Sequence, residues 1–285
     1  MLSEYKDNFI RLEHPLKPKH LVFCDFDETY FPHVLLNEHR RELEELEAFI
    51  ERKSREGELM IGWVSGSKLE DILRKMSGGK FRIFPHFIAS DLGTELTYVT
   101  QERYGVRDEQ WDLRLESSGF SEEAVKTLVR ELSQEYDVDL TPQTQLGSSR
   151  FKWNFYYRQR DPLTDLHTIK HIRDLAGRYR VDVNINRCNP LAGDPEDCYD
   201  VDFIPLGTGK AEIVRFMLER YGVQPEHAFA FGDSGNDLLM LQAVRHGYLV
   251  HNATEEAKGL HPLVSEGAYV KGILHVLKEH LQAGA

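Results

Sequence analysis

The sequence predicts an α/β protein with a mostly parallel core sheet, into which a smaller α+β domain is inserted. Short apolar runs alternate with helical patterns over roughly the first ninety residues and again from Phe203 onward, which is typical of a parallel sheet. Between these stretches, an alternating aromatic strand and amphipathic helices mix without that buried pattern. We therefore expect a core of residues 1–100 and 190–285 and an inserted domain of residues 101–189.

The first part of the core is expected to alternate strand and helix. The apolar residues Leu43, Leu46, Phe49 and Ile50 recur at helical spacing in an otherwise charged segment. The segment after the second strand begins at Ser67 and ends at glycines, as helix capping favours. The expected elements are a strand in 20–25, a helix in 37–57, a strand in 58–66, a helix in 67–79 and two strands in 84–99.

The inserted domain and the second part of the core follow in the same way. The segment "CNPLAGDPEDCYDVDF" (188–203) is rich in Pro, Gly and Asp, so we expect a loop that returns the chain to the core. The expected inserted elements are a helix in 121–136, a strand in 150–158, a helix in 165–179 and a strand in 181–187. In the second core part we expect helices in 207–222, 237–245, 254–260 and 267–281, and strands in 227–232 and 246–252.

Composition narrows the function classes. The 285 residues are 41% hydrophobic and 29% charged, an ordinary globular balance. Asp and Glu (47) outnumber Lys and Arg (35), and the net charge of −12 argues against nucleic acid as a partner. No apolar run approaches the roughly 18 residues of a membrane span, and the polar N-terminal stretch is not typical of a secretory signal. Three cysteines, an odd number in a long chain, argue against a disulfide scaffold, so we expect a cytoplasmic protein.

Paired aspartates occur three times at D-x-D spacing: Asp25/Asp27, Asp137/Asp139 and Asp200/Asp202. Only the first pair directly follows a buried strand, and ligands of open α/β sheets bind outside the carboxyl ends of such strands. Two carboxylates about 4 Å apart repel by roughly 4 kcal/mol at an effective dielectric constant of 20. A fold keeps such a pair if one carboxylate is protonated or if a cation lies between the two, and oxygen ligands with waters suit Mg²⁺.

Further polar residues are expected at the same edge of the sheet. Ser65 ends the second core strand, Lys210 lies at a helix start, and Asp233 and Asp237 follow another core strand. A nucleophile, a metal site and donors for phosphate oxygens are what phosphoryl transfer needs. The "GTGK" segment is not a nucleotide-binding P-loop, because Ile204 stands where that motif needs its first glycine and Ala211 where it needs Ser or Thr.

The ordered set "DFDET" (25–29), Ser65, Lys210 and "GDSGND" (232–237) resembles the four motifs of the haloacid dehalogenase (HAD) superfamily of phosphatases. The resemblance implies a Rossmann-like core and a type-2 cap inserted between Ser65 and Lys210. "IASDLGTELTY" (88–98) resembles the segment that leads into the cap of sucrose-phosphatase-like sugar phosphatases.

This resemblance implies a role for each matching residue. Asp25 would be the nucleophile and Asp27 the general acid and base. Mg²⁺ would be held by the Asp25 carboxylate, the Asp27 backbone carbonyl and Asp233, with Asp237 as a close or water-bridged support. The remaining residues with implied roles are Ser65, Gly66 and Lys210 on the phosphate, Asn236 on the phosphate or Lys210, and Thr29 in shaping the loop. Glu28 departs from the small residue of many relatives, which points to substrate specificity.

Substrate choice is assigned to the inserted domain. The candidate contacts are Lys152, Asn154, Asn184, Asn186 and Arg187, although the alternation in "KWNFYY" also arises in any half-buried sheet. The acidic segment 194–202, which includes Asp200, is either a solvated loop or a group of carboxylates facing an amino group of the substrate.

Longer matches, including "NINRCNPLAGDPEDCYDVDFIP" (184–205), resemble the kanosamine-phosphate branch of these phosphatases. The resemblance implies hydrolysis of kanosamine 6-phosphate, an aminosugar phosphate, to kanosamine and phosphate. One alternative is a phosphatase of another hexose or disaccharide phosphate, such as sucrose 6-phosphate. Another is a phospho-receiver module that carries a phosphorylated aspartate without hydrolysing it. The sequence leaves the oligomeric state open.

Overall fold

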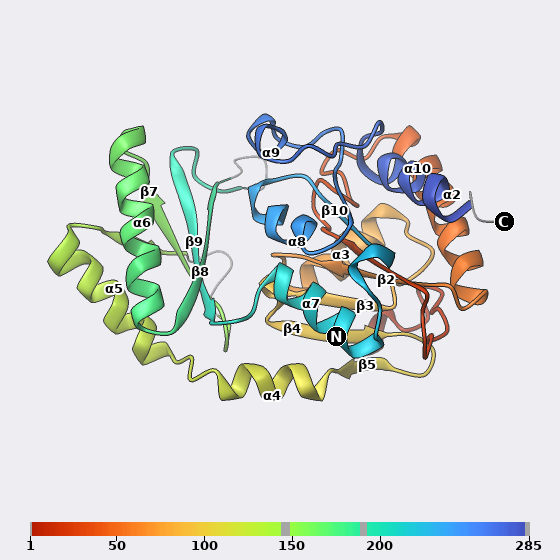
Figure 1. The fold of residues 1–285 in the computed structure, drawn as a ribbon, viewed down its shortest axis with the longest axis horizontal. Helices are drawn as coiled ribbons and strands as arrows, with labels where there is room; N and C mark the ends of the chain where they lie inside the picture. The colour runs from red at the N-terminus through yellow and green to blue at the C-terminus, as the bar shows by residue number, and fades with distance from the viewer. Residues whose placement is uncertain (1, 144–148, 189–192, 283–285) are drawn as a thin grey trace. The chain divides into compact units, whose positions relative to one another are not determined.

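A computed structural model describes residues 2–143, 149–188 and 193–282 (Figure 1). Contacts divide the chain into two compact units. The first, the core unit, combines Met1–Asp108 with Lys210–Ala285, and the second, the cap unit, is Glu109–Gly209. The inserted arrangement follows from this division, because the cap unit interrupts the core unit once.

The core unit is built on a seven-stranded sheet in the order β11-β10-β1-β2-β3-β4-β5. All neighbours from β11 to β3 pair in parallel, whereas β4 and β5 are antiparallel additions at one side. The mostly parallel α/β class predicted from the sequence is therefore confirmed. The strands are β1 (His20–Cys24), β2 (Leu59–Val64), β3 (Phe87–Ser90), β4 (Glu95–Val99), β5 (Tyr104–Arg107), β10 (Ala228–Gly232) and β11 (His246–Leu249).

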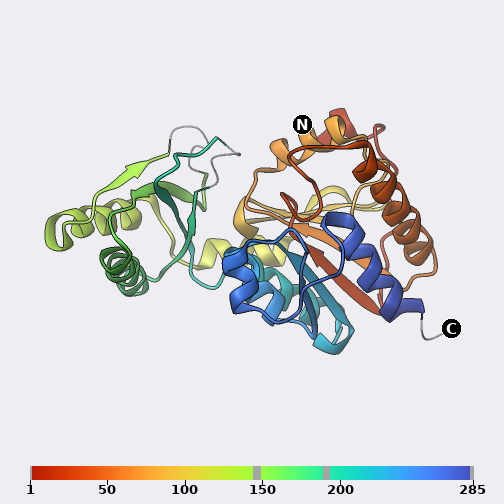
Figure 2. The same ribbon diagram turned by 90° about the horizontal axis from the view of Figure 1, so that it is seen from above.

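Helices cover both faces of this sheet (Figure 2). On one face, Leu46 and Ile50 of α2 and Ile273 of α10 join a buried cluster with side chains of β1, β2 and β10. The burial of these apolar side chains provides most of the stability of such a layer. The core helices are α1 (Leu2–Tyr5), α2 (Asn37–Arg55), α3 (Leu69–Gly79), α7 (Lys210–Tyr221), α8 (Leu238–Gln242), α9 (Glu255–Leu260) and α10 (Tyr269–Gln282), with short 3₁₀ turns η1 (Asp91–Gly93), η3 (Pro225–His227) and η4 (Gly235–Asp237).

The cap unit has an antiparallel four-stranded sheet in the order β6-β7-β9-β8, with α5 and α6 packed on one face. Every second residue of the two central strands belongs to its buried cluster and faces the helices: Phe155 and Tyr157 of β7, and Val201 and Phe203 of β9. The cap elements are α4 (Glu109–Ser117), α5 (Glu122–Tyr136), β6 (Leu140–Pro142), β7 (Trp153–Arg158), α6 (Pro162–Arg178), β8 (Val181–Arg187) and β9 (Cys198–Pro205).

Two expectations about local structure were wrong. Much of the expected return loop forms β9, which pairs with β7 and β8 at the centre of the cap sheet, so the cap unit ends later than the expected residue 189. The cap unit also begins later, at Glu109 rather than at residue 101. The segment "YDVDF" alternates polar and apolar residues, which suits a half-buried strand. The helix expected to start at Ser67 begins at Leu69, and its N-cap Lys68 makes no side-chain capping bond.

Within the described residues, every helix is too short or too polar to cross a lipid bilayer. Cys24, Cys188 and Cys198 are free, in agreement with the absence of a disulfide scaffold expected from their number.

Candidate active site

Asp25 lies at the carboxyl edge of the core sheet because β1 is flanked by two parallel neighbours. Cys24 pairs with Phe231 of β10 and Trp63 of β2, and the Asp25 backbone N–H continues the ladder by donating to the carbonyl of Phe231 at 2.9 Å. Parallel strands end at the same edge, so the loops after β1, β2 and β10 come together there. The predicted meeting of Asp25, Ser65 and Asp233 at this edge follows from the strand order.

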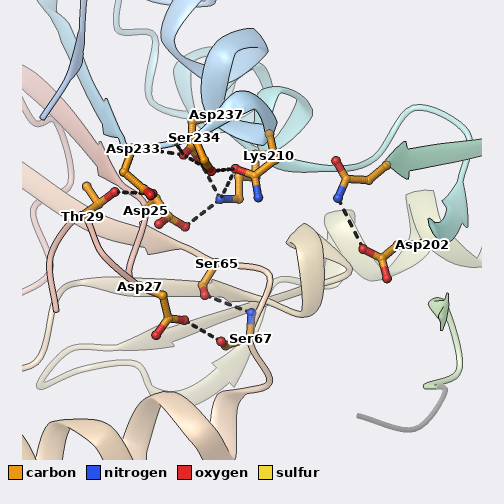
Figure 3. A network of polar contacts seen from close by, with 12 residues as sticks. Asp25, Asp27, Thr29, Ser65, Ser67, Asp202, Lys210, Asp233, Ser234 and Asp237 are labelled. Atoms are coloured by element: carbon orange, nitrogen blue, oxygen red, sulfur yellow. Dashed lines mark hydrogen bonds and ion pairs between the residues drawn. The ribbon is translucent and has the colours of Figure 1, made fainter. Parts of the chain in front are cut away.

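Lys210 lies between two carboxylates at this edge (Figure 3). Its ammonium donates to Oδ1 of Asp25 at 2.6 Å and to Oδ1 of Asp237 at 2.7 Å. All three side chains are almost fully buried. The side-chain oxygen of Asn236, Oδ1, lies 3.5 Å from the same ammonium and accepts a hydrogen bond from Ser234 Oγ at 2.9 Å. The structure thus shows the contact between Asn236 and Lys210 that the sequence suggested.

Asp237 shapes the loop that carries Asp233. Its Oδ2 accepts bonds from the backbone N–H groups of Asp233 and Ser234 at 3.0 and 3.2 Å. The turn fits only because residue 232 is glycine, since an added Cβ would lie 2.3 Å from the Cβ of Asp237. With Lys210 on Oδ1 and two amides on Oδ2, Asp237 is arranged as a structural support.

Asp233 is tied to the first loop by Thr29, whose hydroxyl donates to Oδ1 of Asp233 at 3.1 Å. This bond joins the loops after β1 and β10, which agrees with the loop-shaping role expected for Thr29. Carboxylate oxygens of Asp25, Asp233 and Asp237 lie within 4.8 Å of one another. The second oxygens of Asp25 and Asp233 accept no hydrogen bond from any residue that the structure describes.

The electrostatics of this cluster favour a bound cation. Burial raises the pKa of Asp25 to about 7, against the lowering effect of Lys210. Burial and the charge of Asp237 also raise the pKa of Asp233 well above its usual range. Burial alone would lower the pKa of Lys210, but Asp237 and Asp25 raise it, so the lysine is charged. One ammonium faces three carboxylates, and the open oxygens of Asp25 and Asp233 form an oxygen-only donor set that suits Mg²⁺.

Asp27 lies in contact with residues that the sequence analysis missed. Ser67 Oγ donates to Oδ2 of Asp27 at 2.6 Å, and Lys75 of α3 forms an ion pair with Oδ1. The sequence analysis predicted Ser67 only as the start of a helix, and it gave Lys75 no role. The sequence held one signal for Lys75. This residue lies about two helical turns after the Ser65 loop, on the helix α3 that directly follows that loop.

The Ser65 loop is fixed by the turn between β3 and β4. Leu92 N–H donates to the carbonyl of Ser65, and Asp91 N–H to that of Ser67, both at 2.9 Å. Both turn residues have positive φ, 55° for Asp91 and 60° for Leu92, a conformation that non-glycine residues adopt rarely. Ser65 Oγ accepts the Ser67 N–H at 3.0 Å. Gly66 follows directly, and contact with phosphate by Ser65 or Gly66 stays a prediction.

Glu28 holds the end of the first loop. Its carboxylate accepts bonds from the His33 backbone N–H at 2.6 Å and from the Tyr269 hydroxyl at 3.1 Å. Its carbonyl accepts a bond from the Asn252 side chain at 2.7 Å, and its φ is 59°. Through these contacts, Glu28 connects the first loop to Asn252 and Tyr269, which is a structural role. The effect of Glu28 on substrate specificity stays a prediction.

The predicted substrate contacts of the cap unit divide between the two faces of its sheet. Asn154 donates to Oδ1 of Asp202 at 2.7 Å, and Asn184 to Oδ2 at 3.3 Å, all on the face opposite α5 and α6. The register places Asn186 opposite Asp200 on the same face.

Arg187 differs from these residues. The Arg187 guanidinium lies over the ring of Tyr199, which packs against the buried cluster, so Arg187 belongs to the other face. Lys152 directly precedes β7 and is 3% exposed, which is rare for a lysine. Arg187 therefore lies on the opposite face of the cap sheet from the asparagines with which the sequence analysis grouped it.

Comparison with known proteins agrees with this geometry. The family model of sucrose-6F-phosphate phosphohydrolase matches residues 18–280. The chain is 56% identical over 277 residues to kanosamine-6-phosphate phosphatase from Bacillus subtilis (strain 168), covering 97% of this chain and 96% of that protein.

Two solved structures agree as well. A haloacid dehalogenase-like hydrolase protein from Bacillus subtilis has a TM-score of 0.80 and 53% identity, covering 99% of this chain and 98% of that one. The sucrose-phosphatase from Synechocystis sp. PCC6803, solved with sucrose and phosphate, has a TM-score of 0.70 at 16% identity, covering 92% and 98%, and shows the fold alone. The chain therefore belongs to the sucrose-6F-phosphate phosphohydrolase family of phosphatases, within the HAD superfamily.

Proposed function

We propose that this chain hydrolyses a sugar phosphomonoester through an aspartyl-phosphate on Asp25, and that kanosamine 6-phosphate is its substrate. The observation that carries the chemistry is the buried contact between Lys210 and Asp25, 2.6 Å long, beside the open oxygens of Asp25 and Asp233. Such a site offers a fixed nucleophile, a positive charge for phosphate oxygens and a place for a metal ion.

In the first step, an oxygen of Asp25 attacks phosphorus and the bond from phosphorus to the sugar oxygen breaks. Asp27 gives a proton to the departing sugar oxygen, which leaves as a hydroxyl. Lys210 and Ser65, supported by Asn236 and the Gly66 amide, bind the phosphoryl oxygens. The contacts of Asp27 with Ser67 and Lys75 support this role, because they fix its carboxylate beside the Ser65 loop.

In the second step, water attacks the phosphorus of the aspartyl-phosphate and the bond to Asp25 breaks. Asp27, now a carboxylate, accepts a proton from the water. Inorganic phosphate leaves and the Asp25 carboxylate is restored. The same residue thus gives a proton in one step and receives one in the other, so the cycle closes without a further acid or base.

The residues fit a magnesium ion. Asp25, Asp233 and the backbone carbonyl of Asp27 would hold it, with Asp237 as support. Such an ion neutralises charge on the phosphoryl group during transfer. The raised pKa values of Asp25 and Asp233 support this assignment, since burial works against two carboxylates that only Lys210 balances among the described residues.

The substrate proposal rests on the 56% identical relative, named as a kanosamine-6-phosphate phosphatase, whose similarity includes the cap unit. A second candidate, sucrose 6-phosphate or another hexose or disaccharide phosphate, is favoured by the family model. Membership in a phosphatase family excludes the receiver module. We further propose that the cap unit selects the sugar and that the protein works in the cytoplasm.

The test is phosphate release from a panel of sugar and aminosugar phosphates, with Mg²⁺ and with a chelator. We expect kanosamine 6-phosphate to have the highest kcat/KM, and Asp25→Asn to abolish turnover while thermal melting shows a folded protein. Asp71→Asn, a partly exposed acid of α3 that pairs with Arg74 at the surface, is the matched control. An active Asp25→Asn protein would refute the mechanism, and a preference for glucose 6-phosphate or sucrose 6-phosphate would refute the substrate.

A further inference from the structure

One face of the cap sheet is lined by polar side chains, although part of it is buried. We call this the polar face, which lies opposite α5 and α6. On β9, Asp200 and Asp202 point to it, whereas Val201 and Phe203 point to the buried cluster. Asp202 is only 7% exposed, so this face is not a solvated acidic loop. The members of the polar face are Gln143, Asn154, Tyr156, Asn184, Asn186, Asp200 and Asp202.

Gln143 leaves a hydrogen-bond acceptor unused beside Asp200. Its side-chain amide donates to Oδ1 of Asp200 at 2.7 Å and to the carbonyl of Phe155 at 3.1 Å. These two acceptors fix the orientation of the amide, because a flipped group would place its carbonyl against a carboxylate. Gln143 is 5% exposed, and its Oε1 is buried without a partner among the described residues. A buried acceptor without a donor is costly, which points to a missing donor.

Asn154 repeats this arrangement at Asp202. Its amide nitrogen donates to Asp202, and its Oδ1 is buried without a partner in the part of the chain that the structure describes. Asn154 is 3% exposed. Each of these two neighbouring amides donates to a carboxylate, and its own acceptor oxygen has no donor among the described residues. An ammonium ion supplies three donors.

Asp200 is also short of positive charge. It accepts bonds from Gln143 and from the Cys188 thiol, the latter at 3.4 Å, and no described Lys or Arg forms an ion pair with it. Burial raises the pKa of Asp200 to about 7, and the charges of Asp194 and Asp202 add to the rise. Arg158, at the far end of β7, is exposed and lies opposite Cys198. Asp194 instead accepts the hydroxyl of Tyr156 at 2.9 Å.

A metal ion fits this place poorly. Among the described residues, the one group of three or more acids with oxygens close enough to share an ion is Asp25, Asp233 and Asp237. The polar face instead mixes carboxylates with amide acceptors spread along two strands, which suits the hydroxyl and amino groups of a sugar.

We infer that Asp200, together with Oε1 of Gln143, binds the protonated amino group of an aminosugar phosphate and so determines specificity. The inference rests on the proposed function, since it names the part of the substrate that the cap unit recognises. Asp202, Asn154 and Asn184 then offer acceptors and donors to neighbouring hydroxyls. An alcohol in place of the ammonium loses a charge-assisted hydrogen bond, which is about twice as strong as a neutral one.

The test measures kcat/KM for kanosamine 6-phosphate and for glucose 6-phosphate, which has a hydroxyl in place of the amino group. Glucosamine 6-phosphate, with its amino group on another carbon, checks the position. In Asp200→Asn, we expect the ratio of kanosamine 6-phosphate to glucose 6-phosphate to fall about 10- to 100-fold, mainly through KM. Gln143→Met, which keeps the side-chain length and removes both the acceptor and the amide that donates to Asp200, lowers the ratio less. Asp197→Asn, an exposed acid just before β9, leaves the ratio unchanged.

The outcomes separate the inference from the proposed function. If wild-type protein releases phosphate from none of these sugars, the proposed function fails. If wild-type protein is active, but both folded variants keep the wild-type ratio, Asp200 does not bind the amino group. Equal losses for both substrates in Asp200→Asn would show a purely structural role and also overturn the inference. Thermal melting verifies that each variant is folded.

Discussion

Lys75 forms an ion pair with Asp27, so the residue proposed to move the proton is held by a side chain from α3. Ser67 holds the other carboxylate oxygen at 2.6 Å. Both contacts arise because α3 follows directly on the Ser65 loop. The position of the proposed general acid thus depends on a helix that contributes no residue to the HAD motifs.

Replacing Lys75 by Met is expected to lower kcat by about tenfold and to change KM little. The physical reason is that general acid and base catalysis contributes about 10²- to 10⁴-fold, and a mispositioned Asp27 loses part of it. The matched control is Arg74→Met on the same helix, whose guanidinium pairs with Asp71 at the surface. Steady-state kinetics check the result, and an unchanged kcat in Lys75→Met would show that Ser67 alone orients Asp27.

Removing Lys210 is expected to destabilise the core unit strongly. In Lys210→Met, the carboxylates of Asp25 and Asp237 stay buried without their partner, which typically costs about 3–5 kcal/mol. Lys271→Met removes a surface pair with Glu42 and should cost less than about 1 kcal/mol. Urea unfolding without added metal measures both.

A double variant sharpens this prediction. Asp25→Asn added to Lys210→Met should recover part of the lost free energy of unfolding, since one buried charge is removed with its partner. Full additivity of the two changes would show that the ammonium and the Asp25 carboxylate do not interact.

Magnesium is expected to raise the melting temperature of the wild-type protein. A ligand that binds only the folded state stabilises it by about 2.7 kcal/mol at one hundred times its dissociation constant. Asp233→Asn should lose most of this shift, because it removes one of the two open carboxylates. Asp71→Asn should keep it. Calorimetry at rising MgCl₂ with a NaCl control measures the effect, and equal shifts in all three proteins would place the ion elsewhere.

Much of the active site could be predicted from the sequence because parallel strands end at one edge. Asp25, Ser65 and Asp233 each follow a buried apolar run. Once these runs pair as parallel strands, the three residues lie at the same edge of the sheet. Lys75 could not be found in this way. The contact of Lys75 with Asp27 depends on how α3 packs beside the first loop, and the helical spacing of residues in the sequence does not predict that packing.

The cap unit shows the limit of composition as a guide. The acids Asp200 and Asp202 made residues 188–203 look like a loop, yet they alternate with Val201 and Phe203 and form a central strand. Their burial is possible because Gln143, Asn154 and Asn184 donate to them across the sheet. Such cross-strand partners come from distant segments, so the local sequence gave no sign of them.

Acid is expected to destabilise the core unit through His86, whose side chain is fully buried. Its Nδ1 accepts the Ile61 backbone N–H at 3.1 Å, and Nε2 lies 2.9 Å from the hydroxyl of Ser54. Burial lowers the pKa of His86 to about 3, so the folded protein holds it neutral. Below pH 6.5 the unfolded chain binds a proton there and the folded chain does not. Stability is therefore lost as the pH falls from about 6.5 towards 3, by up to about 1.4 kcal/mol per pH unit.

The variant His86→Asn isolates this contribution. Its carbonyl can still accept the Ile61 N–H, but the side chain cannot titrate, so stability at neutral pH falls while its slope with pH flattens. Urea unfolding at several values between pH 7 and 5 measures the slope. His167→Asn, at an exposed position of α6, is the control and should keep the wild-type slope. A slope in His86→Asn equal to that of wild type would mean that other histidines whose pKa burial lowers, such as the half-buried His20, carry the acid sensitivity.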